Sequence, residues 1–161
     1  MKKIVDMIQK IQIAIGGFFL MIFLVTVVFQ MLSRYLGIAA TWTEEVSMYS
    51  FIWAVFMGGA AMVYENRHFA FTTLSDGLKN EKVKSILSIV IYIIMLIFAV
   101  LMVYHGIKVT KQFWNYTWTN IPSFKRGPTW ICMPLCGVTS ALYLVALVCE
   151  EIGKIAKGGN K

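Results

Sequence analysis

Side chains able to bind metals or cofactors are few and widely spaced in this chain. His68 and His105 are its two histidines, and each lies near the border of a different apolar run. A helix rises about 1.5 Å per residue, so the run between them should separate the two by roughly a bilayer. They therefore cannot hold one haem between them. His105 is predicted to be a border or packing histidine.

The three cysteines also offer little reaction chemistry. Cys132, Cys136 and Cys149 all fall in the last apolar run. The three-residue gap between the first two is not a redox spacing. They are predicted to be small packing residues. We expect no metal, no cofactor and no catalytic residue, so the chain is not predicted to be an enzyme.

The composition points to a membrane. The chain has 161 residues, of which 58% are hydrophobic and 14% charged, and its mean hydropathy is +0.70. Soluble proteins average about 25% charged residues. No Lys, Arg, Asp or Glu occurs within residues 11–33, 46–64, 85–107 or 127–149, and each run is close to the roughly 20 residues that span a bilayer. We predict an all-α integral membrane protein with one four-helix domain over residues 1–161.

The basic residues lie at the borders of these runs. Ten of the fifteen Lys and Arg residues occur in the N-terminal segment, the 65–84 connection and the C-terminal segment. The positive-inside rule therefore places both termini in the cytoplasm. The net charge of +7 is expected to meet membrane lipids and not nucleic acid. The first run is longer than the roughly 7–15 residues of a signal peptide core, so it should be retained.

The corner between the 11–33 and 46–64 spans carries a helix-start signal. Thr41 and Glu44 have the spacing of a capping box. Glu44 and Glu45 also place negative charge at the positive end of a helix dipole. Arg34 is predicted to pair with one of these glutamates across the short connection. Trp42 is suited to the membrane border, where its ring is apolar and its N–H is wet.

Other border and packing features are less specific. A helical stripe after residue 107 would carry Trp114 and Trp118 as interfacial anchors, until proline at 122 ends it. A short amphipathic segment is expected within 65–84. Small residues are expected where helices approach closely, and these are Gly58, Gly59, Gly137 and Ala141.

The membrane interior carries no ionised group. A carrier that couples ions to a solute needs charged or ion-binding groups inside the bilayer, and none occurs within the four runs. A helper subunit that anchors or stabilises another membrane protein fits this absence. A membrane-anchored cytochrome or redox subunit and a small homodimeric exporter remain as alternatives.

Four segments together form a recognisable pattern: Gln30-Met31-Leu32-Ser33-Arg34-Tyr35, Trp42-Thr43-Glu44-Glu45, Phe56-Met57-Gly58-Gly59-Ala60 and Arg67-His68-Phe69. With these segments the chain resembles, over its whole length, the DctQ-like small membrane subunit of tripartite ATP-independent periplasmic (TRAP) transporters. A departure from the family pattern precedes Pro128-Thr129-Trp130, at Ser123-Phe124-Lys125-Arg126.

The resemblance implies a fixed scaffold subunit in a bacterial inner membrane. Its partner would be a much larger transport (M) subunit that carries sodium and substrate and moves like an elevator. A periplasmic binding protein would deliver an organic acid such as a sialic acid or a C4-dicarboxylate. For the corner residues Arg34, Trp42, Glu44 and Glu45 a scaffold role is expected. For Arg67 and His68, contacts with lipid headgroups or the large subunit are expected on the cytoplasmic side.

Overall fold

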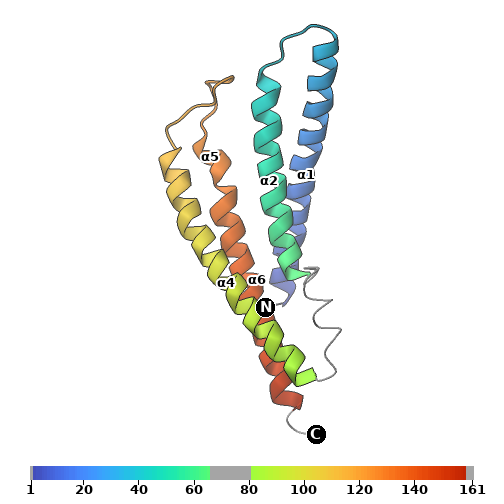
Figure 1. Cartoon of the computed structure of the whole chain (residues 1–161), viewed down its shortest axis with the longest axis vertical. Coiled ribbons are helices and arrows are strands. Elements are labelled where there is room, and N and C mark those ends of the chain that lie inside the picture. The colour runs from blue at the N-terminus through green and yellow to red at the C-terminus, as the bar shows by residue number, and fades with distance from the viewer. Residues whose placement is uncertain (1, 66–80, 159–161) are drawn as a thin grey trace.

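The computed structural model describes residues 2–65 and 81–158. These residues form helices α1 (Lys2–Tyr35), α2 (Trp42–Tyr64), α4 (Glu81–Gln112), α5 (Gly127–Trp130) and α6 (Cys132–Gly158) (Figure 1). Four segments are long and apolar enough to cross a membrane, with α5 and α6 together supplying the fourth. The predicted all-α architecture with four spans is confirmed.

The helices extend beyond the charge-free runs. α1 begins at Lys2 and α4 runs from Glu81 to Gln112, whereas the runs begin at residue 11 and cover 85–107. The absence of charge marks only the part that must lie in hydrocarbon. Helical hydrogen bonds continue into the wet border, where Lys and Glu are good helix formers. The last run contains a break between α5 and α6.

The long helices lie side by side in a row. α1 packs along α2, α2 along α6, and α6 along α4 (Figure 1). The chain therefore consists of an α1/α2 hairpin and an α4/α6 hairpin, joined along α2 and α6. α1 and α4 form the two edges of the row, and most of their large apolar side chains are exposed. A bilayer accommodates such surface because lipid tails are as apolar as a protein core.

Two glycines allow α4 and α6 to approach closely. A Cβ atom on Gly137 would lie 2.7 Å from Val103 Cγ2 and 2.9 Å from the Ala99 carbonyl oxygen. A Cβ atom on Gly106 would lie 2.9 Å from the ring nitrogen of Pro134. Real Cβ contacts are longer than this, so only hydrogen fits at either position. Gly137 therefore lies at a helix crossing.

The other small residues behave differently. A Cβ atom on Gly58 or Gly59 would meet nothing within 4 Å. The close approach of α1 to α2 depends on Gly16, whose Cβ would lie 3.3 Å from the Gly58 nitrogen. The prediction of a close contact is therefore wrong for Gly59, because this glycine faces open space. Ala141 packs beside the buried cluster of Tyr92, Ala99 and Leu144.

Candidate functional site

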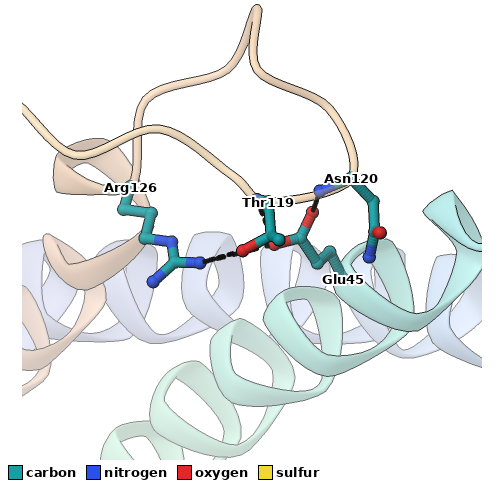
Figure 2. A network of polar contacts seen from close by, with 4 residues as sticks. All are labelled: Glu45, Thr119, Asn120 and Arg126. Atoms are coloured by element: carbon teal, nitrogen blue, oxygen red, sulfur yellow. Dashed lines mark hydrogen bonds and ion pairs between the residues drawn. The ribbon is translucent and has the colours of Figure 1, made fainter.

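A buried carboxylate joins the two hairpins at the end of the row opposite the termini. Glu45 lies in the first turn of α2 and is 6% exposed. Its Oε1 accepts a hydrogen bond of 2.6 Å from the Thr119 backbone N–H, and its Oε2 accepts one of 2.7 Å from that of Asn120 (Figure 2). Arg126 Nη2 lies 3.6 Å from Glu45 Oε1 and donates to Thr119 Oγ1 at 2.7 Å. We call these four residues the Glu45 clamp.

The loop that carries the other three clamp residues is folded as a small hairpin. The N–H of Trp118 donates to the Phe124 carbonyl at 2.9 Å, and the N–H of Arg126 donates to the Tyr116 carbonyl at 2.8 Å. Thr117 and Lys125 form an antiparallel bridge between its two arms. These bonds turn two successive backbone N–H groups toward Glu45, an arrangement that suits a charged acceptor.

The predicted helical stripe after residue 107 is therefore wrong. α4 ends at Gln112, and the N–H of Tyr116 donates to the Phe113 carbonyl in a turn. Backbone groups of the loop find better partners across the hairpin and in Glu45 than in a continued helix. The Trp118 ring packs 4.7 Å from that of Tyr49 and 5.5 Å from that of Phe124, measured between centroids. Trp118 thus faces α2 and not lipid, which corrects its predicted role as an interfacial anchor.

Trp114 lies between the end of α4 and the first arm of this loop, and it is 46% exposed. A Cβ atom on Gly127 would lie 2.7 Å from the Trp114 Cα atom, so glycine at 127 is needed for the loop to close on α5. Trp114 remains available at the surface as a border aromatic. Trp42 is similarly exposed, with its ring centroid 5.7 Å from that of Phe29.

The predicted pairing of Arg34 with Glu44 or Glu45 is also wrong. Among the described residues Glu45 pairs with Arg126, and no ion pair joins Arg34 to either glutamate. Arg34 and Glu44 are both exposed. Arg34 lies in the last turn of α1, where a positive charge favours the helix dipole.

Backbone bonds fix the α1–α2 corner instead. Gly37 has φ +70°. The N–H of Ile38 donates to the Ser33 carbonyl, and the N–H of Gly37 donates to the Arg34 carbonyl. This pattern is a Schellman motif, in which a left-handed glycine ends a helix. The predicted capping box is absent, because Thr41 is helical (φ −63°, ψ −28°) and makes no side-chain cap.

A second polar contact joins the hairpins inside the membrane span. Gln12 of α1 donates from Nε2 to Thr139 Oγ1 at 2.8 Å, and the Tyr143 hydroxyl donates to Gln12 Oε1 at 2.5 Å. All three residues are buried. The Tyr143 ring contacts that of Tyr64, whose hydroxyl donates to Asp6 Oδ1 at 2.7 Å. We call Gln12, Thr139 and Tyr143 the Gln12 network.

The sequence reasoning missed the Gln12 network, although a signal was present. Gln12 is an isolated amide in a charge-free run, and Thr139 and Tyr143 are four residues apart and so share a helix face. A polar side chain in lipid needs a partner, because an unpaired one is costly there. The sequence does not show which helix supplies the partner of Gln12. The packing of the helices does, and the partner residues lie on α6.

Removing one side of the Gln12 network should destabilise the fold modestly. Tyr143→Phe leaves the Gln12 carbonyl oxygen without its donor, and Gln12→Leu leaves the Tyr143 hydroxyl without its acceptor. Each is expected to cost about 1–2 kcal/mol, and the double variant less than their sum. Thermal unfolding of the purified chain in detergent measures this. Tyr35→Phe, at a tyrosine that is 87% exposed, is the control and should change nothing.

The other residues that were predicted as candidates belong to neither the Glu45 clamp nor the Gln12 network. Arg67, His68 and most of the expected amphipathic segment in 65–84 lie outside the described residues. His105 is exposed on α4. Cys132 and Cys136 are buried free thiols, and Cys149 is exposed. In residues 2–65 and 81–158, no three His, Cys, Asp or Glu side chains gather in a group that could hold a metal.

The geometry describes a structural unit whose polar groups are used to hold helices together. The Glu45 clamp fixes one end of the junction between hairpins, and the Gln12 network fixes its interior. A comparison with curated proteins gave no match. The family model for the DctQ component of tripartite ATP-independent periplasmic transporters matches residues 22–153. This range covers most of the chain, from the second half of α1 to near the end of α6, and the chain therefore belongs to the DctQ family of small TRAP transporter membrane subunits.

Proposed function

We propose that this chain is the fixed scaffold subunit of a sodium-driven TRAP importer of organic acids, in the bacterial inner membrane with both termini cytoplasmic. Its partner is the large elevator-type M subunit, which carries sodium and substrate. A periplasmic binding protein delivers the substrate, of the sialic acid or C4-dicarboxylate class. The observation that carries the proposal is the family match over residues 22–153.

The shape of the chain supports a scaffold role. An elevator domain needs a neighbour that stays still while it moves through the bilayer. A row of four spans offers a broad wall, and the Glu45 clamp and the Gln12 network resist sliding of one hairpin against the other. The runs 11–33, 46–64, 85–107 and 127–149 hold no Lys, Arg, Asp or Glu. Glu45 lies just before the second run, and its carboxylate is bound by the loop.

Border residues complete the proposal. Trp42 and Trp114 anchor the wall at one membrane border, since exposed tryptophan favours that zone. Arg67 and His68 contact lipid headgroups or the large subunit at the other border. Both roles would resist tilting, because they fix the depth of the wall at its two ends.

Reconstitution tests the proposal directly. Vesicles are prepared with this chain alone, with the chain plus the M subunit, and with both plus the binding protein. Uptake of labelled sialic acid or C4-dicarboxylate is then measured under an inward sodium gradient. We expect uptake only from the complete set, and none when ATP replaces the gradient. Uptake by this chain alone would contradict a scaffold role, as would full uptake by the M subunit and binding protein without it.

A further inference from the structure

One side of α4 changes from apolar to basic toward the end of the fold that carries the Glu45 clamp. Positions 90, 94, 97, 101, 104, 108 and 111 follow steps of four and three residues, so they share one side of the helix, and their side chains are exposed. Tyr92, Ala99 and Gly106 lie on the opposite side, against α6. The exposed side therefore points outward at the edge of the row (Figure 1). We call it the outer face, and it consists of Val90, Ile94, Ile97, Leu101, Tyr104, Lys108 and Lys111.

Two lysines end the outer face at the depth of a membrane border. Lys108 is the first charged residue after the run 85–107, and Lys111 follows about 4.5 Å along the axis, on the next turn. The Nζ atom of Lys108 lies 4.3 Å from the centre of the Tyr104 ring, which holds this ammonium on the outer face. An ammonium carries three N–H donors, so the contact with the ring leaves donors for a further acceptor.

No acid of this chain neutralises the two lysines. Residues 82–149 contain no Asp or Glu. Glu45 lies at the same end of the fold, but its carboxylate is bound by the loop backbone. Among the described residues, no acid pairs with Lys108 or Lys111. Glu81, where the connection 66–80 enters α4, lies about 40 Å along the axis from Lys108, so acids at that end are out of reach.

The apolar part of the outer face suits hydrocarbon better than another helix. Ile94 lies about 21 Å along the axis from Lys108, so this part covers the roughly 15 Å of hydrocarbon in one leaflet. Helices that pack together in a membrane use small residues at the contact. The alanine and the glycine of this part of α4, Ala99 and Gly106, already face α6. The outer face offers only large side chains, to which a flexible acyl chain can adapt.

We propose that the outer face binds an anionic phospholipid, whose phosphate lies on Lys108 and Lys111 and whose acyl chain follows the apolar residues down to Ile94. Charge complementarity selects this ligand. Two ammonium groups without an acid partner favour a headgroup with net negative charge over a zwitterionic one. The site needs only this chain and a bilayer, so it stands or falls separately from the transport role proposed above.

Native mass spectrometry of the full purified chain tests the site. The protein is titrated in detergent with phosphatidylglycerol, which is anionic, or with phosphatidylethanolamine, which is zwitterionic. Phosphatidylglycerol should bind about twentyfold more tightly. Lys108→Gln and Lys111→Gln should each lower its affinity about fivefold, and the double variant should lower it to the level of phosphatidylethanolamine. Replacing both lysines by arginine keeps the charges and should retain the preference.

The matched control removes a positive charge at the same membrane border. Arg34 is exposed in the last turn of α1, at the opposite edge of the row, and Arg34→Gln should leave phosphatidylglycerol binding unchanged. Equal losses in Arg34→Gln and Lys108→Gln would overturn the site, as would equal binding of the two lipids to the unaltered chain. So would a double Gln variant that keeps phosphatidylglycerol but no longer co-purifies with the large subunit, because the outer face would then bind a protein.

Discussion

Glu45→Gln is expected to separate the two hairpins at one end and to lower the melting temperature by about 10 °C. The carboxylate accepts two backbone N–H groups and faces the Arg126 guanidinium. The amide can accept only one of these donors well, and its NH₂ group meets the other. Hydrogen bonds to a charged group are worth about 1.5–3 kcal/mol each, so the loss should be about 3 kcal/mol.

A thiol-reactive dye measures this loss during thermal unfolding. Cys149 is exposed and reacts at once, whereas the buried Cys132 and Cys136 react only as the fold opens. Glu44→Gln is the matched control, since Glu44 is the neighbouring acid and is exposed. It should shift stability by less than about 0.5 kcal/mol. Identical melting of the two variants would show that the clamp does not hold the hairpins together.

Gly137→Leu should have the larger effect, with a loss of about 4 kcal/mol or more. Even a Cβ atom at this position would lie 2.7 Å from Val103 Cγ2 and 2.9 Å from the Ala99 carbonyl oxygen. Because part of the obstacle is α4 backbone, no rotamer change relieves it, and the α4/α6 hairpin must open. Overpacking of this kind typically costs 1–3 kcal/mol for added methylenes, and more where backbone is displaced.

The control for this variant should gain stability, whereas Gly137→Leu should lose it. Gly17→Leu adds the same side chain to α1 in open space, and leucine is the better helix former by roughly 0.5–1 kcal/mol. Gly137→Ala should fall between the two. The same dye assay ranks the three proteins. If the Gly137→Leu and Gly17→Leu proteins have the same melting temperature, the crossing of α4 and α6 is not as close as described.

The four membrane spans could be predicted from the sequence because the absence of charged residues over a run is a local and strong signal. A run without charge marks lipid burial wherever it occurs, and all four runs are helical apart from the break at Ile131 in the last one. Their order in the row was not predictable. α4 is apolar on every side, since lipid accepts the same side chains as a core. No stripe of polar residues therefore shows which face meets another helix.

The site was predicted only in part for a similar reason. Glu45 was identified as a corner residue, but its partners lie 74 and 75 residues later in the chain. Local spacing favoured the nearer Arg34, and the same local view extended α4 through Trp118. Arg126, which completes the clamp, comes from the loop that follows α4 and not from the corner itself. Contacts between segments that are distant in the sequence depend on packing, and they cannot be predicted from the charge pattern or the hydrophobic periodicity.

The separation of Glu45 from Thr119 has a consequence for biosynthesis. Ribosomes add about 5–20 residues per second, so Glu45 waits roughly 4–15 s before the backbone that will neutralise it has been made, 74 residues downstream. The first hairpin is thus inserted with an uncompensated acid at its tip. Closure over that acid requires α4 to have placed Thr119 at the same end of the fold as Glu45, so the bond records that the third span is correctly threaded.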